Sequence, residues 1–325
     1  MAALVESVLH ARAPDLVDLR HLSPSDLDTL LDEETRVWRE TLDWDFGKSA
    51  DLVRRFVDLR ALNGCALIIQ DRAVGYCYFV FEEHKGLVGD LYVRAQFRTV
   101  ENENRLLSAV LDSLIAAPHV RRIESQLMMI ASDPERVMPG SRFLSAYDRN
   151  FMLLRFAEAP DLQARPRARM HFEKWSEHHQ ENTAQLIASA YGGHIDSRIN
   201  DQYRSIAGAR RFLYNIVQYP GCGTFFQPAS FVAYDLATGS LCGLALASMV
   251  GPDAGHITQL CVSPALRRTG MGYELLRRSL KIIRDHGCSK VSLTVTSANR
   301  EAVQLYEHAG FRTIRRFSAY VWEGF

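Results

Sequence analysis

The chain has 325 residues, of which 47% are hydrophobic and 23% charged, a composition that excludes a mainly disordered chain. Because this length is about twice that of a usual domain, we expect two compact domains, with one large domain as the alternative. Lys plus Arg and Asp plus Glu number 38 each, so no global field draws the protein to nucleic acid or to an anionic membrane.

The first half predicts the order β, α, α, β, β, β, α, β. Its elements, in chain order, are a strand at 16–19, a helix capped by Ser23 or Ser25 and running to about Glu40, a helix at 50–62, two strands in GCALIIQDRAVGYCYFVFEE joined by a tight turn around Asp71 and Arg72, a strand in GDLYV, a helix at 105–116 and a strand in RRIESQLMMI.

The second half predicts the same order. Its elements are a strand in MHFEKW, two helical stretches within 177–218, a hairpin of SFVAYD and LCGLALASMV turning at Thr238 and Gly239, a strand in HITQLCV, a Gly-containing loop, a helix at 273–286 and a strand in KVSLTVT. The C-terminal WEGF is expected to cover a strand edge or an interface.

The two halves align when one is shifted by 169 positions, which places Leu91 on Leu260 and Arg98 on Arg267. A chance match of amphipathic helices is the alternative to a repeat. The prolines and polar residues of AEAPDLQARPRAR predict the boundary. We therefore predict domains at 1–160 and 161–325, each α/β (α+β) with a mixed, mostly antiparallel twisted sheet flanked by helices.

Cysteine spacing and the N-terminus bear on the compartment. The six cysteines lie far apart without a CxxC pair, which favours reduced thiols. The N-terminus shows no basic region followed by an apolar core, and no run approaches ~18 apolar residues. We expect a soluble, cytoplasmic protein without membrane contact.

No HExxH occurs, and His178 and His179 are expected on different sides of a helix, so no metal is predicted.

The segment HITQLCVSPALRRTGMGYELLRRSL carries the chemistry: a strand runs into a loop and then directly into a helix. Gly270 and Gly272 allow a phosphate to approach the backbone, the first helical amides lack internal partners, and the helix dipole favours an anion there. Arg267 and Arg268 add cations. The alternative is that the glycines only mark the transition from strand to helix. Neither the longer GxGxxG dinucleotide-binding fingerprint nor a Walker loop is present.

These residues resemble the GCN5-related N-acetyltransferase (GNAT) superfamily, whose pyrophosphate loop has the form [R/Q]xxGx[G/A]. The segment NREAVQLYEHAGF, which follows the strand KVSLTVT, is similar to a second sequence element of this superfamily. The resemblance covers about 170–325 well and only the topology and a few positions of the first half. It implies a tandem GNAT protein whose N-terminal half is degenerate, because Glu101 and Glu103 stand opposite the loop glycines.

The resemblance implies an acetyl-CoA or related acyl-CoA site as follows. Pantetheine would bond to the backbone of Leu260, Cys261 and Val262 as an added strand, the loop cation would be Arg267, and Asn299 would bond to pantetheine or cap its helix. The pyrophosphate would lie on amides of Arg268, Thr269, Gly270, Met271, Gly272 and Tyr273.

Transfer requires an acid for the thiolate and a base for the amine. Tyr306 looks like the family's general acid, and a core aromatic is the alternative. His256 is the candidate base, with a solvent-facing strand-end histidine as the alternative. Direct transfer is favoured over an acyl intermediate on Cys261. Tyr191, His194 and Asp196 are candidate acceptor-binding residues.

We therefore predict a transferase, an N-acetyltransferase acting on a small-molecule or peptide amine, with the C-terminal domain active and the chain a monomer or homodimer. The alternative is a CoA-binding regulatory or structural module without turnover. A nucleic-acid-binding role based on the Arg165, Arg167 and Arg169 cluster is a third hypothesis, which the zero net charge disfavours.

Overall fold

The computed structural model describes residues 14–131, 133, 135–164, 170–219 and 221–325. The Arg165–Arg169 cluster and part of the expected boundary lie outside these residues. The first half contains β1 (Asp15–Asp18), α1 (Pro24–Leu42), α2 (Gly47–Asp58), β2 (Asn63–Ile69), β3 (Arg72–Glu82), β4 (Lys85–Val93), α3 (Val100–Ile115), β5 (Arg122–Gln126) and β6 (Leu144–Arg155).

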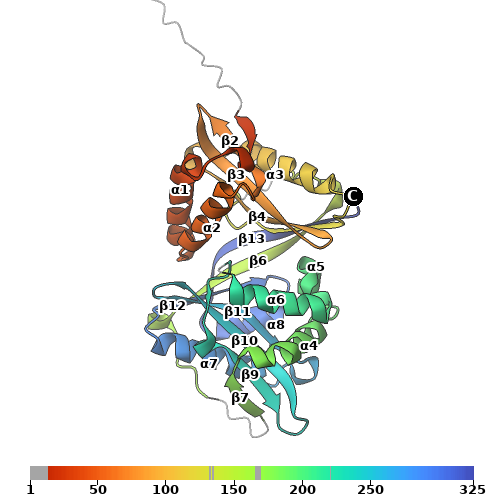
Figure 1. Cartoon of the computed structure of the whole chain (residues 1–325). Helices are drawn as coiled ribbons and strands as arrows, with labels where there is room; N and C mark the ends of the chain where they lie inside the picture. The colour runs from red at the N-terminus through yellow and green to blue at the C-terminus, as the bar shows by residue number, and fades with distance from the viewer. Residues whose placement is uncertain (1–13, 132, 134, 165–169, 220) are drawn as a thin grey trace, which may run out of the picture.

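The second half repeats this order and adds short elements (Figure 1). It contains β7 (Met170–Lys174), the 3-10 helix η5 (Glu177–His179), α4 (Gln180–Ala190), α5 (Asp196–Ile199), the 3-10 helix η6 (Asp201–Arg204), α6 (Ile206–Gln218), β8 (Thr224–Phe225), β9 (Phe231–Asp235), β10 (Ser240–Gly251), β11 (Ala254–Val262), α7 (Met271–Asp285), β12 (Lys290–Thr296), α8 (Arg300–His308) and β13 (Arg312–Glu323).

Local signals in the sequence explain where several elements begin and turn. Ser23 caps α1 in a capping box with Asp26, which satisfies amides that lack helical partners. Gln70 and Asp71 have φ of +48° and +60° between β2 and β3, the left-handed pair that a two-residue hairpin turn requires. The predicted tight turn is present, but one residue earlier than expected, because Arg72 already begins β3.

The strands of both halves form one continuous sheet in the order β1-β2-β3-β4-β5-β13-β6-β12-β11-β10-β9-β7, with β8 paired to β10. Only β4–β5 and β11–β12 are parallel pairs among the described strands. The last strand of each half lies between the lobes, as Figure 1 shows. There β6 pairs with β12 of the second half, and β13 pairs with β5 of the first. The two halves thus exchange their last strands.

This exchange corrects the expected picture of two separate sheets. The sequence interpretation included neither β6 nor β13, although their pairing, from Arg312–Leu153 to Trp322–Leu144, joins the lobes. Of the two expectations for WEGF, the strand edge is wrong, whereas its first residues do lie at the interface between the halves, where β13 pairs with β5. Its Trp322 is fully buried at the centre of the sheet and donates its indole N–H to the Pro139 carbonyl over 2.9 Å.

One hydrophobic core crosses from the first half to the second. Trp44 and Phe46, between α1 and α2, belong to the same buried cluster as Phe151 on β6 and Val250 and Ala254 at the β10–β11 hairpin. Because burial of large aromatic side chains contributes strongly to stability, this cluster makes each lobe depend on the other.

Polar contacts from both halves reinforce the interface between the two lobes, which is called the seam below. From the first half, Asp43 reaches Lys290 over 2.8 Å. From the second half, Asp201 bonds to Lys85, and Gln202 donates to Glu82 over 2.8 Å. The connection between the first two main helices of each half therefore docks on the opposite lobe.

Candidate active site

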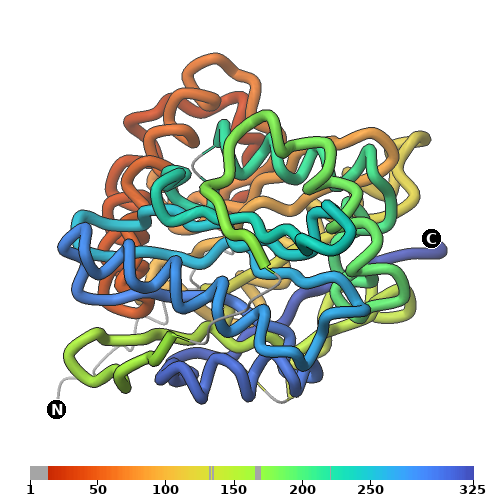
Figure 2. Tube along the Cα trace, turned by 90° about the horizontal axis from the view of Figure 1, so that it is seen from below, coloured from red at the N-terminus to blue at the C-terminus, as the bar shows by residue number. Residues whose placement is uncertain are grey.

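A cavity of about 660 Å³ opens in the C-terminal lobe, where β11, the α7 loop and α8 meet. In Figure 2, α7 and α8 appear in blue and dark blue. Its wall consists of Ala190, Tyr191, His194, Leu260, Cys261, Val262, Leu266, Arg267, Arg268, Thr269, Gly270, Gly272, Tyr273, Asn299, Glu301, Ala302, Gln304, Leu305, Tyr306 and His308.

The structure brings thirteen of the sixteen candidate residues to this wall. The side chain of Met271 is 1% exposed and belongs to a core cluster, so only its backbone remains relevant to the loop. Asp196 lies behind the wall, 3.6 Å from His194. His256 lies elsewhere, in the seam between the lobes.

The loop before α7 has the backbone shape of an anion cradle. Gly270 caps the helix with φ of +86°, and Arg268 also adopts a left-handed φ of +60°. The N–H of Glu274 bonds to the Gly270 carbonyl over 3.1 Å, so the amides of Met271 and Gly272 stand in the first helical turn, where the helix itself supplies no acceptor. A Cβ on Gly272 would meet only ordinary contacts, the nearest at 3.4 Å to Leu305.

The two arginines of this loop differ in their contacts. Arg267 donates from Nη2 to the Ala190 carbonyl over 2.5 Å, which fixes its guanidinium beside the cavity. Arg268 is largely exposed and forms an ion pair with Glu301. Arg267 is thus the held cation, while Arg268 connects the α7 loop with the start of α8.

The strands beside the cavity separate where the cofactor interpretation requires it. The parallel pairing of β11 and β12 ends at Ile257 and Leu293, although β11 continues to Val262. The backbone at 260–262 pairs with β10 on its other edge. An open edge of this kind can accept an extended ligand as an additional strand.

Tyr306 and Asn299 lie at the α8 side of the cavity. Tyr306 is 8% exposed and packs 6.0 Å from the Phe311 ring while lining the cavity, and burial raises the pKa of its phenol. Oδ1 of Asn299 accepts the Ala302 amide over 3.3 Å, which confirms the capping interpretation, and its Nδ2 lies 3.4 Å from Nε2 of His194.

An aromatic and amide network surrounds Tyr191 and His194 at one side of the cavity. Gln259 donates from Nε2 to the Tyr191 hydroxyl over 2.8 Å. Tyr203 stacks on Tyr191 at 4.4 Å, and His194 approaches the same ring edge-on at 5.3 Å. Because each partner restrains the next, the network fixes the position of the His194 ring.

Sequence interpretation missed four polar residues of this region: Gln259, Tyr203, Arg149 and Thr296. Thr296 donates to Asp196, and Arg149 Nη1 lies 3.4 Å from the same carboxylate. Gln259 was detectable as a polar residue within an apolar strand. Arg149 carried no local signal, because it comes from β6 of the first half.

His256 is not placed to deprotonate an acceptor in this cavity. Its side chain is buried, bonds from Nδ1 to Ser292 over 2.9 Å, and packs edge-on against Trp44 at 5.0 Å. Burial lowers its pKa to about 3. The solvent-facing alternative is also wrong, since His256 belongs to the interface between the lobes.

All six cysteines are free thiols. Burial raises the pKa of Cys261 to about 12, so the protonated thiol dominates at neutral pH. Since the thiolate is the reactive nucleophile, this environment disfavours an acyl-cysteine.

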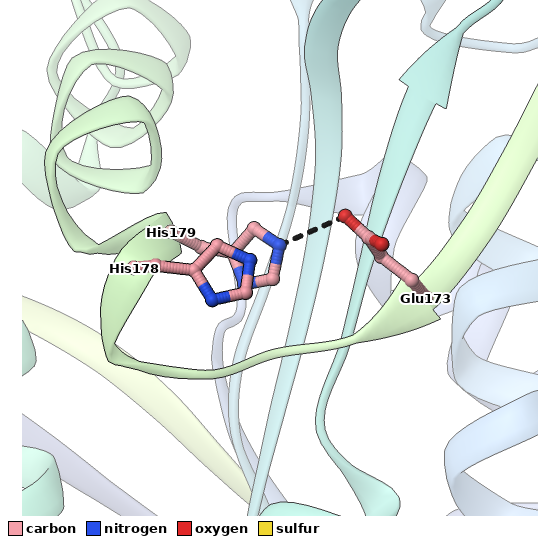
Figure 3. Close-up of side chains that lie close together, drawn as sticks. All are labelled: Glu173, His178 and His179. Carbon is pink, nitrogen blue, oxygen red and sulfur yellow. Dashed lines mark hydrogen bonds and ion pairs between the residues drawn. The ribbon is translucent and has the colours of Figure 1, made fainter.

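Glu173, His178 and His179 form a cluster away from the cavity (Figure 3). The prediction that the two histidines point to different sides was wrong, because their ring centroids are only 3.7 Å apart on η5. His179 is already bonded at both nitrogens, accepting the Ser176 amide at 3.0 Å and contacting Glu173 at 2.8 Å. These bonds stabilise the start of the helical segment, and a metal would have to displace them.

The equivalent loop of the N-terminal lobe is filled by its own side chain. Glu103, opposite Gly272 in the repeat, is 1% exposed. It accepts the Ala131 amide over 3.1 Å and pairs with Arg136 over 2.5 Å. A carboxylate therefore occupies the start of α3, where a phosphate would be repelled.

Comparison with known proteins agrees with this architecture. Residues 197–311 match the acetyltransferase (GNAT) family. A mycothiol acetyltransferase of Beutenbergia cavernae is 35% identical over 100 residues, 30% of this chain and 33% of that protein. An N-alpha-acetyltransferase of Sulfolobus acidocaldarius is 34% identical over 71 residues, 22% of this chain and 42% of that protein. The chain thus aligns with well under half of each relative.

Solved structures match over nearly the whole chain. A GCN5-related N-acetyltransferase from Sphaerobacter thermophilus has a TM-score of 0.68 at 18% identity and covers 96% of both chains. A tandem GNAT protein from the clavulanic acid biosynthesis pathway has a TM-score of 0.59 at 15% identity, covering 95% of this chain and 98% of that one. The fold is therefore that of tandem α/β acetyltransferases. The family match itself lies in the C-terminal half, at residues 197–311.

Proposed function

We propose that this protein is an N-acyltransferase that moves an acetyl group from acetyl-CoA directly to an amine, with the C-terminal lobe active. The observation that carries the proposal is one cavity that joins the Gly270 loop, the open edge of β11 and the Tyr306 side chain. Anion cradle, strand edge and proton donor are thereby arranged along a single groove.

The residues present fit an acyl-CoA. The amides of 268–273 and the Arg267 guanidinium would hold the pyrophosphate. The backbone at 260–262 would hold pantetheine, and Nδ2 of Asn299 would face its acyl end. When bound, acyl-CoA supplies a thioester whose carbonyl carbon an amine attacks.

Tyr306 is the proposed general acid. A phenol keeps its proton at neutral pH and would pass it to the leaving sulfur, although burial raises the pKa of Tyr306 and so weakens it as an acid. The hydroxyl thus balances the charge left when the carbon–sulfur bond breaks.

His194 is the proposed base, in place of His256. It lines the cavity, its Nδ1 accepts the backbone N–H of Asp196 over 3.2 Å, and the Asp196 carboxylate lies 3.6 Å from the same nitrogen. A carboxylate this close stabilises the imidazolium that forms when the ring accepts a proton. The His194 ring would take the proton that the amine loses.

The N-terminal lobe is proposed to build the acceptor side rather than to turn over substrate. Arg149 from β6 contacts Asp196, and Arg122 donates to the Ile199 carbonyl over 3.2 Å. These contacts fix α5 and η6, which carry Asp196 and Tyr203. The relatives named mycothiol acetyltransferase and N-alpha-acetyltransferase support a small-molecule or peptide amine as the acceptor.

The proposal includes the cellular compartment in which the protein works. Among the described residues, no helix is long and apolar enough to cross a membrane. The six free thiols support a reducing compartment such as the cytoplasm.

The alternative is a CoA-binding module without turnover. Full-length protein incubated with acetyl-CoA and a panel of small-molecule and peptide amines, with thiol release recorded, separates the two. We expect release that depends on both protein and amine, and a fall of about 100-fold or more in kcat for Tyr306→Phe with CoA affinity retained. The exposed Tyr214→Phe variant is the control. CoA binding without release for any amine would support the module instead.

A further inference from the structure

A second cavity, of about 350 Å³, lies in the N-terminal lobe beside the start of α3. It is lined by Arg98, Met129, Ile130, Ala131, Asp133, Arg136, Met138, Arg315, Arg316, Phe317, Ser318 and Tyr320. Arg98 is the repeat counterpart of Arg267, so this cavity is the counterpart of the one in the C-terminal lobe. Part of its wall comes from β13, the strand contributed by the second half.

Arg98 brings a positive charge into this cavity that protein carboxylates do not neutralise. Its Nε donates to the Val93 carbonyl over 3.2 Å, and its guanidinium lies 5.2 Å from the Tyr92 ring centroid. Its Nη2 is buried and has no hydrogen-bond acceptor among the described residues. A buried charged donor without a partner is costly, which points to a ligand.

Arg315 faces the same space and increases the positive charge. Its Nε donates to the Met128 carbonyl over 2.7 Å. Burial and then the charge of Arg98, which lines the same cavity, lower its pKa. Within the part of the chain that the structure describes, neither forms an ion pair.

Other charged groups on the wall do not cancel this pair. Arg316 adds a third cation. Asp133 is the acid on the wall, and its Oδ1 accepts the Glu135 amide over 2.8 Å. Arg136 is neutralised by Glu103. The net character of the cavity is therefore cationic.

The cavity is not a second copy of the acyl-CoA site. Glu103 fills the position of the phosphate cradle at the α3 start, and the volume is about half that of the 660 Å³ cavity. The unneutralised cations lie on Arg98 and on β13. A compact anion fits these features better than an extended nucleotide does.

We propose that this cavity binds a small organic anion through a phosphate or carboxylate group held between Arg98 and Arg315. Two planar guanidinium groups can each donate two parallel hydrogen bonds to one such group and thereby relieve their mutual repulsion. The bound anion would join the β4–α3 connection to β13. It would strengthen the lobe where the second half contributes its strand.

Isothermal titration calorimetry of the full-length protein with inorganic phosphate, and separately with malonate, tests the proposal at ionic strength held constant with NaCl. Wild type, Arg98→Gln/Arg315→Gln and the exposed-arginine control Arg36→Gln are compared, each with and without saturating CoA. Any binding to the C-terminal loop is common to all three proteins, so the difference between variants reports the N-terminal cavity.

We expect at least one probe to bind wild type and Arg36→Gln, with affinity at least about tenfold lower in the double variant, since the double variant loses the charge-assisted hydrogen bonds of both guanidinium groups. The probe that binds identifies the group. Equal binding by all three proteins, or no binding of either probe, overturns the proposal. Should the double variant not fold, the single variants Arg98→Gln and Arg315→Gln serve. Turnover is measured separately, so failure here leaves the proposed transferase activity untouched.

Discussion

Arg149 donates from Nη1 to the hydroxyl of Thr296 over 2.9 Å. This bond connects β6, the last strand of the first half, to β12, the strand that diverges from β11 beside the large cavity. Residues of the first half therefore complete the polar surroundings of the site in the second. A site that looks confined to one repeat in the sequence depends on both in the fold.

The exchanged strands predict that the second half does not function alone. A fragment of residues 161–325 lacks β6, which separates β12 from β13, and exposes Val250 and Ala254, which normally lie in the shared core. We expect this fragment to be insoluble or to lack a cooperative thermal transition, and expect coexpression with 1–160 to restore a soluble complex. Size-exclusion chromatography and calorimetry provide the measurement. A stable, folded 161–325 fragment would contradict the shared-core interpretation.

Local signals made the conformation of the Gly270 loop predictable, whereas the interface between the lobes depended on pairing between distant segments. Gly270 and Arg267 lie within four positions of each other, so loop shape and charge can be read together. In β13, buried Phe317, Ala319 and Val321 alternate as a strand requires. The arginines that precede these residues made the segment look polar in the sequence. Its place in the sheet is set by pairing with β6 and β5 of the other half, which the local sequence does not reveal.

His194→Gln is expected to lower kcat at least about tenfold with little change in stability, because a partly exposed side chain at the cavity loses its basic nitrogen while the backbone contacts remain. Asp196→Asn should lower kcat in the same direction by weakening the hold on the imidazole. Steady-state kinetics over pH, with thermal denaturation of each variant, provide the test. The exposed His84→Gln variant is the control. Unchanged kcat in His194→Gln would remove His194 from the proposed chemistry.

The two loop glycines should respond differently to substitution. Gly270 has φ of +86°, so Gly270→Ala is expected to destabilise the protein by about 1–2 kcal/mol. Gly272 has room for a methyl group, so Gly272→Ala should fold normally, and serves as the matched control for Gly272→Glu. The latter reproduces the carboxylate of the N-terminal loop and should weaken CoA binding at least about tenfold. Unaltered CoA affinity in Gly272→Glu would place the pyrophosphate elsewhere.

His256 should give the folded protein a measurable sensitivity to acid. Burial lowers its pKa to about 3 in the folded state, against about 6.5 in an unfolded chain. Between these values the unfolded chain binds a proton that the folded protein does not. Its contribution is therefore complete above about pH 6.5 and is lost as the pH falls towards 3, by at most about 5 kcal/mol.

Replacing His256 with Phe removes this titration and keeps an aromatic ring beside Trp44, at the loss of the Ser292 hydrogen bond. Urea denaturation from pH 7.5 to 4 should show the stability of wild type falling more steeply than that of His256→Phe. The difference between the two curves is the readout, because carboxylates titrate in both proteins. Parallel curves would mean that His256 can be protonated without leaving the seam, and that the aromatic packing around it tolerates a charge.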